Sequence, residues 1–336
     1  MPNTPKVSVV MSVFNGEKHL CECLDSILAQ TLNEFEFIIV DDASTDKTKS
    51  ILQDYASKDS RIVIITNEVN KERSISRNIG ISAARASLIA VVDADDFSMP
   101  HRLQVQYDFM MKNPNVGVCG ALIQIYETGQ IVPYYRDNEI LRAYLLFNCC
   151  VAHPVVMYRK EVVLKVGGYN ESMFQAEDYD LWVKLLLERT VQFANISDVL
   201  LRYRAYPDAN RDAYNEEQNA VADTVRIKLL QQIGITPSTE ELHVHGFFSD
   251  ARSIYVLNEW DDVKRWKEKL LQANKEASLV SNESITFILN AKCPNVLFFY
   301  YATTIKKLCY SMCPSPLWKF MSKLKKAIKI KFQSQL

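Results

Sequence analysis

The fold of this chain is decided by the stretch Ser87-Leu88-Ile89-Ala90-Val91-Val92-Asp93-Ala94-Asp95-Asp96. Its first six residues form a short, uncharged run rich in apolar side chains, which predicts a buried β-strand. Three carboxylates follow at the end of that strand. Carboxylates that lie close together repel one another, and a divalent cation such as Mg²⁺ or Mn²⁺ relieves the repulsion and suits a substrate diphosphate. The alternative is an acidic surface turn that caps the next helix.

Strand and helix patterns alternate through the first 112 residues. Predicted strands cover 7–14, 35–40, 61–66 and 87–92, and predicted helices cover 17–30, 46–56, 74–84 and 100–112. This alternation predicts an α/β fold with a doubly wound, mostly parallel sheet and helices on both faces. Ligands bind beside the carboxyl ends of the strands in such sheets. Polar clusters follow three of these ends, at 12–15, 41–44 and 93–96.

The pattern changes after Pro114. Strands are predicted over 116–126 and 130–135, and helices over 138–147 and 177–188. From about 213 to 275 the sequence is helical and charged, which predicts a helical C-terminal extension.

The eight cysteines contain no Cys-x-x-Cys pair and do not match the spacing of a zinc site. Such a scatter predicts reduced thiols in a cytoplasm. The first residues lack the basic and apolar segments of a signal peptide, and no apolar run reaches the length of a membrane-spanning helix, so we expect neither.

Five motifs in one order resemble glycosyltransferase family 2, whose members are inverting, metal-dependent enzymes with the GT-A fold. The motifs are Val7-Ser8-Val9-Val10-Met11-Ser12-Val13-Phe14-Asn15-Gly16, Ile38-Ile39-Val40-Asp41-Asp42-Ala43-Ser44-Thr45-Asp46, Ser76-Arg77-Asn78-Ile79-Gly80, Asp93-Ala94-Asp95-Asp96 and Ala176-Glu177-Asp178-Tyr179-Asp180-Leu181-Trp182. On this resemblance we divide the chain into four parts. They are a nucleotide-sugar-binding half of the GT-A domain (1–112), its acceptor-binding and catalytic half (113–210), a helical extension (211–292) and a basic amphipathic tail (293–336).

The resemblance implies that Ser12, Asn15 and Asp42 contact the nucleotide. A carboxylate can accept a hydrogen bond from a uracil N–H, although Asp42 could instead cap the helix predicted from residue 46. Arg77 is expected beside the nucleotide-sugar, because a guanidinium holds carboxylates or a diphosphate through paired donors. The alternative for Arg77 is a solvated side chain on a helix face.

Asp93 and Asp95 match the family's Asp-x-Asp motif. The resemblance implies that Asp93 faces the ribose or a metal-bound water and that Asp95 ligates Mn²⁺ or Mg²⁺, with Asp96 in support. His153 is a further candidate for the metal or the acceptor. A lone histidine is more often a structural hydrogen-bonding group, and that alternative is open here.

Asp178 is the candidate catalytic base, with Glu177 to orient it or to touch the acceptor. Inverting transfer requires one carboxylate to take the proton of the acceptor hydroxyl. The alternative is that both acids sit at a helix N-terminus because the helix dipole favours negative charge there. Arg204 could meet the diphosphate, and Tyr206 stands where many relatives have histidine.

The resemblance implies a hexosyl- or N-acetylhexosaminyltransferase that moves a sugar from a nucleotide-sugar, expected to be UDP-linked, to a saccharide or lipid-linked saccharide in bacterial surface-polysaccharide assembly. The Gln-x-x-Arg-Trp signature of processive synthases is absent, so we expect one sugar per encounter. The alternatives are a metal-dependent nucleotidyltransferase and a non-catalytic, membrane-associated scaffold with the same fold.

The C-terminal tail is strongly basic, although the whole chain has a net charge of −1. Residues 302–336 contain eight Lys, no Arg and no acidic residue, and an apolar helical stripe begins at Leu317. This pattern predicts that residues 317–332 bind an anionic membrane surface, which would place the enzyme on the cytoplasmic face of a membrane. Packing on the protein's own helices and nucleic-acid binding are the alternatives. No base-stacking or groove-reading module accompanies the charge, so we expect no nucleic-acid partner.

Overall fold

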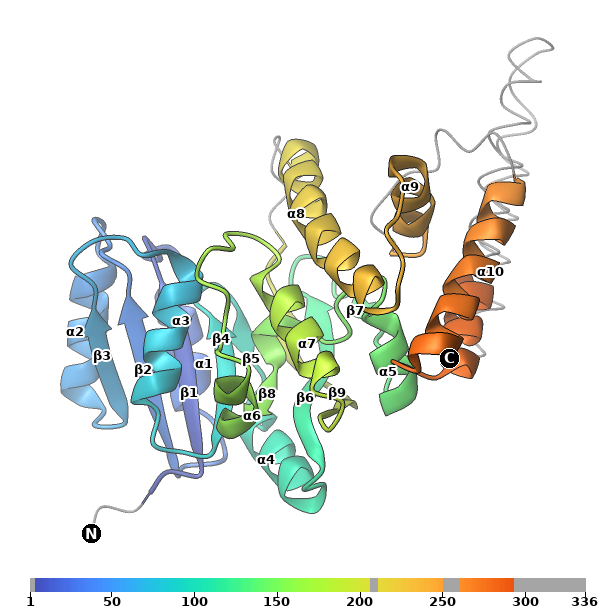
Figure 1. Cartoon of the computed structure of the whole chain (residues 1–336). Helices are drawn as coiled ribbons and strands as arrows, with labels where there is room; N and C mark the ends of the chain where they lie inside the picture. Colours follow the sequence, from blue (N-terminus) through green and yellow to red (C-terminus); the bar gives the residue numbers. More distant parts are fainter. Residues whose placement is uncertain (1–3, 206–210, 250–259, 293–336) are drawn as a thin grey trace, which may run out of the picture.

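The computed structural model describes residues 4–205, 211–249 and 260–292. The predicted basic tail and Tyr206 lie outside these described residues. Among them, a nine-stranded sheet has the order β3-β2-β1-β4-β8-β6-β9-β5, and β7 pairs with β6 (Figure 1). The strands are β1 (Val7–Val13), β2 (Phe35–Asp41), β3 (Ile62–Thr66), β4 (Leu88–Asp93), β5 (Phe97–Ser98), β6 (Val116–Ile125), β7 (Ile131–Val132), β8 (Met157–Arg159) and β9 (Gln192–Tyr203).

The predicted α/β fold with a mostly parallel sheet is confirmed. β3, β2, β1 and β4 run parallel, and β6 pairs in parallel with β9, whereas β8 is antiparallel to both β4 and β6. The helices are α1 (Leu20–Leu28), α2 (Thr48–Lys58), α3 (Glu72–Ala83), α4 (Arg102–Lys112), α5 (Asn138–Tyr144), the 3₁₀ helix η1 (His153–Val155), α6 (Lys160–Lys165), α7 (Glu177–Leu187), α8 (Arg211–Gln232), α9 (Thr239–Phe247) and α10 (Trp260–Ala277). A last described helix covers 282–292.

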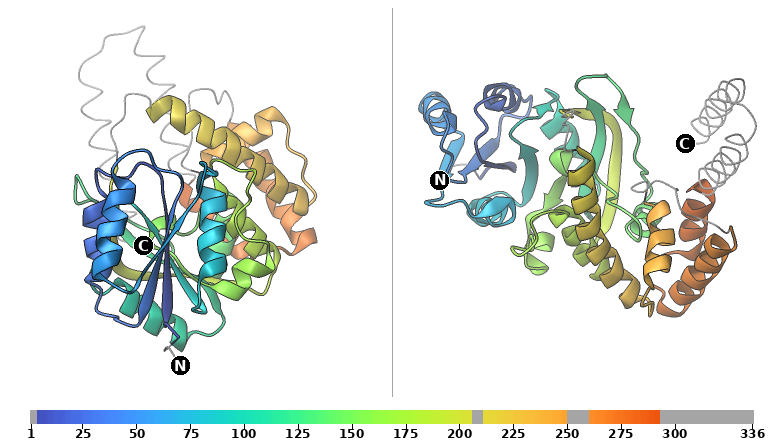
Figure 2. Two further views of the ribbon diagram at one scale, coloured as in Figure 1. Left: turned by 90° about the vertical axis from the view of Figure 1, so that its left-hand side faces the viewer. Right: turned by 90° about the horizontal axis from the view of Figure 1, so that it is seen from above.

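Helices cover both faces of the sheet, because successive strand residues point to opposite sides. Val9 and Met11 of β1 belong to a core shared with α1, α2 and α4, while Val10 between them belongs to a core shared with α3, α7 and α8. Figure 2 shows α1 and α3 on opposite sides of the strands, and Figure 1 shows α8 above α7 and α9 and α10 at the end of the molecule away from β3. No helix in the described ranges is long and apolar enough to cross a membrane.

Helix α3 packs directly on the sheet at Gly80. A Cβ atom on Gly80 would lie 2.6 Å from Cγ1 of Val10, so a larger residue would push the helix away from β1. This close approach fixes the height of Arg77, one helical turn earlier, over the carboxyl ends of the parallel strands.

The sequence patterns missed β9, which is the longest strand. Its buried positions do not alternate regularly with exposed ones, and buried Asn195 interrupts the apolar run. The Asn195 side chain donates to the carbonyls of Tyr135 and Cys150, at 2.8 and 2.9 Å. A polar residue whose amide nitrogen is satisfied by such tertiary contacts is easily taken for a loop residue from the sequence alone.

Candidate functional site

A cavity of about 560 Å³ opens at the carboxyl ends of β1, β2 and β4. The nucleotide- and metal-binding candidates that line it are Ser12, Asn15, Asp42, Arg77, Asp93 and Asp95. The parallel register brings these distant residues together, since Ser12 of β1 lies directly beside Asp93 of β4. The other three candidates, His153, Glu177 and Asp178, do not line this cavity.

The loops after β1 and β2 are tied to each other at the mouth of the cavity. The Asn15 side chain accepts a hydrogen bond from the Thr45 backbone at 2.8 Å, and the Asn15 backbone donates to the Ser44 hydroxyl at 2.9 Å. The Gly16 backbone donates to the Thr48 hydroxyl at 2.8 Å. The Asn15 side chain therefore shapes the loop that lines this part of the cavity.

Asp42 is buried and held from the β3–α3 side. Its Oδ1 accepts hydrogen bonds from Asn67 Nδ2 at 2.7 Å and from the Lys71 backbone at 2.9 Å. Helix α2 begins at Thr48 with Lys47 at its N-cap, so Asp42 does not cap that helix. The capping alternative is thereby excluded, and Asp42 presents a fixed carboxylate to the cavity.

The three carboxylates after β4 have different surroundings. Burial acts to raise the pKa of Asp93, but the neighbouring groups, Arg77 first among them, together hold that pKa below its usual value. Burial, with the nearby Asp93 charge, raises the pKa of Asp96 to about 8. The Asp96 Oδ1 accepts from the Arg204 backbone at 2.9 Å, while its buried Oδ2 has no hydrogen-bond partner among the described residues.

These carboxylates fit a divalent cation that shares its ligands with a substrate. The described residues contain no cluster of three or more His, Cys, Asp or Glu side chains arranged to hold a metal ion. Mg²⁺ does not need such a cage, because it commonly binds through one or two carboxylates together with substrate phosphates. Asp93 and Asp95 on the cavity wall, with the unsatisfied Asp96 oxygen behind them, supply that donor set.

Arg77 joins the nucleotide side of the site to the side that carries the candidate base. Only 5% of the residue is exposed, which excludes the solvated-helix alternative. Its guanidinium donates to Asp93 Oδ1 at 3.0 Å and to Glu177 Oε1 at 2.6 Å. Arg73, one turn earlier on α3 and half-exposed, lies 3.7 Å from the same Glu177 oxygen. Charge-assisted contacts of this kind are strong when they are shielded from water.

Asp178 lies in the first turn of α7, next to Glu177. Its Oδ1 accepts from the Tyr179 backbone at 2.8 Å, and the Cys149 thiol donates to its Oδ2 at 3.6 Å. Burial, followed by the neighbouring Glu177 charge, raises the pKa of Asp178 to about 6. A carboxylate with a pKa this near neutrality can take a proton from a hydroxyl and remain mostly ionised beforehand.

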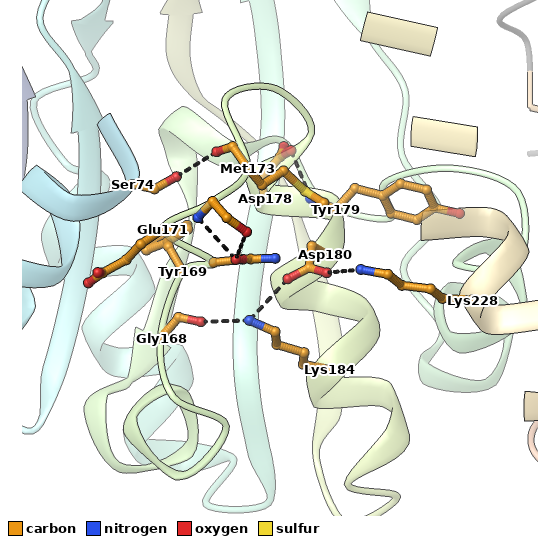
Figure 3. A network of polar contacts seen from close by, with 12 residues as sticks. Ser74, Gly168, Tyr169, Glu171, Met173, Asp178, Tyr179, Asp180, Lys184 and Lys228 are labelled. Carbon is orange, nitrogen blue, oxygen red and sulfur yellow. Dashed lines mark hydrogen bonds and ion pairs between the residues drawn. The ribbon is translucent and has the colours of Figure 1, made fainter. Parts of the chain in front are cut away.

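The loop before α7 lies between α3 and α7 and is hydrogen-bonded to both. Figure 3 shows the Ser74 hydroxyl donating to the Met173 carbonyl, at 3.1 Å, and Lys184 joining Asp180 to the Gly168 carbonyl. Asn78 of α3 also holds this loop, because its side chain exchanges two hydrogen bonds of 2.9 Å with the Tyr169 backbone. Asn78, which follows Arg77 in the family motif, is thus tied to the loop before α7.

His153 lies beneath the site. Its Nε2 shares a 2.9 Å hydrogen bond with the Tyr169 hydroxyl, and the residue is buried. Burial, together with Arg77, lowers the pKa of His153 to about 3, so the ring is neutral near pH 7. These contacts match the structural alternative for His153, and the chain does not bring it to the cavity wall.

Backbone strain gathers around the same region. Four residues other than glycine have positive φ angles there: Asn15 (51°), Ala43 (62°), Glu72 (71°) and Ala176 (56°). Such conformations cost on the order of 1 kcal/mol each and tend to cluster at functional sites. Ala176 is the N-cap of α7, so its left-handed backbone sets the direction in which Glu177 and Asp178 leave the loop.

Arg204 also lines the cavity, just after strand β9, which the sequence patterns missed. Its Nε donates to the Asp95 carbonyl at 3.0 Å, and a terminal nitrogen donates to Glu22 at 2.7 Å. Cys149 was also missed, because no local pattern marks a cysteine whose partner is 29 residues away.

Comparison with known proteins gives the same class. The family model described as glycosyl transferase family 2 matches residues 8–164. The O-antigen biosynthesis glycosyltransferase WbnJ of Escherichia coli is 35% identical over 204 residues, which cover 60% of this chain and 80% of that protein. The UDP-Glc:alpha-D-GlcNAc-diphosphoundecaprenol beta-1,3-glucosyltransferase WfgD of E. coli is 28% identical over 199 residues, covering 59% and 76% of the two chains.

Among solved structures, the mannosyltransferase PcManGT from Pyrobaculum calidifontis, in complex with GDP-Man and Mn²⁺, aligns with a TM-score of 0.53 at 17% identity over 99% of this chain and 88% of that one. At this identity the likeness concerns the fold, which is of the GT-A type. The chain belongs to glycosyl transferase family 2. This membership makes the protein a glycosyltransferase and favours sugar transfer over the nucleotidyltransferase alternative.

Proposed function

We propose that this enzyme transfers a single sugar, with inversion, from a UDP-sugar to a lipid-linked saccharide during assembly of a bacterial surface polysaccharide. The observation that carries the proposal is the Arg77 bridge. One guanidinium joins Asp93, on the wall of the nucleotide-sized cavity, to Glu177, the neighbour of Asp178. This bridge sets a candidate base at a fixed place relative to the donor cavity.

Asp42, Ser12 and Asp93 are the proposed contacts to the nucleoside. The buried Asp42 carboxylate is positioned by two donors and can accept the uracil N–H. The relative WfgD uses UDP-Glc by its name, which supports UDP as the carrier. Asp93 and Asp95 would hold a divalent cation, and that cation, when bound, would neutralise charge on the departing diphosphate.

Asp178 is the proposed general base. It would accept the proton of the acceptor hydroxyl while that oxygen forms a bond to the anomeric carbon, and the bond from the anomeric carbon to the UDP oxygen breaks on the opposite face of the sugar. Glu177, neutralised by Arg77 and Arg73, would keep the loop and α7 in register with the donor. A positioned base of this kind contributes about 10² to 10⁴ in rate.

A thermal-shift screen of the full chain tests the donor assignment. We expect UDP and UDP-sugars with Mn²⁺ to raise the melting temperature, since a ligand at about 100 times its Kd stabilises the folded state by about 2.7 kcal/mol. Asp95→Asn should lose the part of the shift that needs Mn²⁺. Asp108→Asn, an exposed acid on α4, is the matched control and should keep it. If GDP raises the melting temperature and UDP does not, the donor would be a GDP-sugar. If no nucleotide raises the melting temperature, the proposal is overturned.

We further propose that residues 317–332 hold the enzyme at an anionic membrane surface, where a lipid-linked acceptor would be found. Each Lys near such a surface contributes about 1 kcal/mol. The full chain should therefore sediment with phosphatidylglycerol vesicles and not with phosphatidylcholine vesicles. Replacing Lys319, Lys323, Lys326 and Lys329 with Gln should release it. Equal binding of the two proteins to the anionic vesicles would contradict this assignment.

A further inference from the structure

A six-residue segment, 145–150, links the C-terminal helices to Asp178; we call it the strap. It follows α5 and contains Leu145, Leu146, Phe147, Asn148, Cys149 and Cys150. Its first three residues are fully buried although they lie outside any regular helix or strand. Buried backbone carbonyls need hydrogen-bond donors, so the positions of those donors determine where the strap lies.

Three consecutive carbonyls of the strap accept hydrogen bonds from three different helices. The Tyr179 hydroxyl of α7 donates to Leu145 at 2.7 Å, and Nε of Arg226 on α8 donates to Phe147 at 2.8 Å. The His245 ring of α9 lies 2.8 Å from the Leu146 carbonyl. The next residue makes a contact of the opposite direction, because the Asn148 side chain donates to the Ser249 carbonyl just after α9 at 2.8 Å.

The tautomer of His245 follows from its second neighbour. The Trp266 indole nitrogen of α10 lies 3.2 Å from Nδ1 of His245, and an indole N–H can only donate. Nδ1 must therefore accept, and Nε2 carries the hydrogen that it donates to Leu146. Burial lowers the pKa of His245 to about 4, so this neutral tautomer persists at neutral pH. Phe147 stacks on the same ring, with centroids 4.9 Å apart.

At the far end of the strap, the Cys149 thiol meets the candidate base. It donates to Oδ2 of Asp178, whose Oδ1 is held by the Tyr179 backbone. Burial, followed by the negative charge of Asp178, raises the pKa of Cys149 well above its usual value. The thiol is therefore protonated and acts as a donor, and a nucleophilic role is excluded near pH 7.

We propose that the strap is a positioning device, in which helices α8, α9 and α10 fix the backbone of residues 145–150 and Cys149 orients the Asp178 carboxylate as a positioning residue. This inference depends on the proposed function in one respect: Asp178 is the general base of the proposed reaction. The helices that anchor the strap lie beyond residues 8–164, the part that the family model matches. Helices α8, α9 and α10 would thus act on the reaction through the strap.

Several charged or titratable groups face Asp178, and the strap is one contributor among them. They are Glu177 on α7, Arg77 on α3, Tyr169 on the loop before α7, Tyr134 after β7 and Cys149 on the strap. Cys149 donates directly to the Asp178 carboxylate and can be altered without removing a charge, which makes it the cleanest probe.

The test measures the titration of the Asp178 carboxyl by ¹³C NMR in the full-length protein, with the resonance assigned by its loss in Asp178→Asn. Cys149→Ala removes a donor to the charged carboxylate, so the midpoint should rise by roughly half a pH unit. Cys149→Ser keeps a donor and should remain nearer to wild type. Cys150→Ala is the matched control: it removes a neighbouring buried thiol that makes no hydrogen bond to Asp178, and its midpoint should not change. Equal midpoints in Cys149→Ala and Cys150→Ala would overturn the role of Cys149.

A second variant tests the anchor. His245→Phe keeps an aromatic ring against Phe147 but removes the donor to Leu146, and we expect the Asp178 midpoint to rise in a protein that still melts cooperatively. An unchanged midpoint would overturn the contribution of the C-terminal helices. Because the NMR titration needs no substrate, a lack of sugar transfer would count against the proposed function and leave this inference standing. An active enzyme in which Cys149→Ala leaves the Asp178 midpoint unchanged would keep the proposed function and overturn the role of Cys149.

Discussion

The N-terminal segment, residues 7–112, and the second segment, residues 113–205, build their parts of the site in different ways. In the first, Ser12, Asp42 and Asp93 reach the cavity because parallel strands end at one edge of the sheet. In the second, contacts between residues far apart in the chain do the positioning: Glu177 is held by a residue 100 positions earlier and Arg204 is bonded to one 108 positions earlier. The cavity side of the site is therefore set by topology, and the side that carries Glu177 and Arg204 by tertiary contacts.

Asp178→Asn should break the second segment's function and spare the first. We expect kcat to fall by about 10³, because the acceptor hydroxyl would lose its proposed base. UDP binding, which depends on the N-terminal segment, should stay within about twofold, since the replaced side chain is outside the cavity lining. UDP release from a UDP-sugar that the thermal-shift screen selects, in the presence of a lipid-linked saccharide, would measure the rate, and titration calorimetry would measure binding. Near-wild-type turnover would remove Asp178 from the mechanism.

Arg77→Met should damage both segments at once, because Arg77 is the bridge between them. Removing one partner leaves two carboxylates without their buried cation, for which roughly 3–5 kcal/mol of folding free energy is typical. Arg73→Met, on the same helix and against the same Glu177 but half-exposed, is the control and should change stability by about 1 kcal/mol or less. Urea unfolding monitored by circular dichroism distinguishes the two. Similar losses of folding free energy in both variants would show that the buried Arg77 bridge stabilises the fold no more than the half-exposed Arg73 does.

The difference between the two segments also explains which features could be predicted from the sequence. The four parallel strands and the helices between them were predicted to within a few residues, because short apolar runs alternating with helical patterns report local structure directly. The carboxylates of Asp93 and Asp95 were found for the same reason, since a strand end is a local feature. The family resemblance added the Glu177–Asp178 pair, which spacing alone could not separate from ordinary charge at a helix start.

The remaining features could not be predicted, because each depends on contacts with residues far away in the sequence. Strand β9 carries a buried Asn195 whose partners are Tyr135 and Cys150, so its polarity looks like that of a loop. The joining of Arg77 to Glu177 and the contact of Cys149 with Asp178 depend on how α3, α7 and the strap pack. A single sequence contains no periodicity that encodes such contacts.

Gly80→Ala tests whether the close packing of α3 on β1, within the first segment, matters for the Arg77 bridge. The added methyl would meet Val10 at 2.6 Å and push α3 outward, carrying Arg77 with it. Overpacking of this kind costs about 1–3 kcal/mol, and displacement of the bridge should lower kcat more than it weakens UDP binding. Ser82→Ala, at an exposed position of the same helix, is the control and should change neither quantity by much. A Gly80→Ala protein with wild-type stability and turnover would show that the close packing of α3 is unimportant.

The smallest expected effect is a gain in stability from losing the base. The folded protein raises the pKa of Asp178 to about 6 from a usual value of 3.8. The folded state therefore binds this proton more tightly than the unfolded chain does. The resulting contribution to the free energy of unfolding is complete below pH 3.8 and is lost as the pH rises through 6.

Asparagine cannot ionise, so Asp178→Asn should be more stable than the wild type at about pH 7.5, by on the order of 1 kcal/mol, and the difference should vanish near pH 4. Urea unfolding at both pH values measures it, with the exposed Asp108→Asn as a control that should show no such pH-dependent gain. A variant that is less stable than wild type at about pH 7.5 would mean that Asp178 is held by its partners as a structural ion. A variant that gains stability while it loses turnover would show that the second segment keeps this carboxylate in unfavourable surroundings, as a reactive base requires.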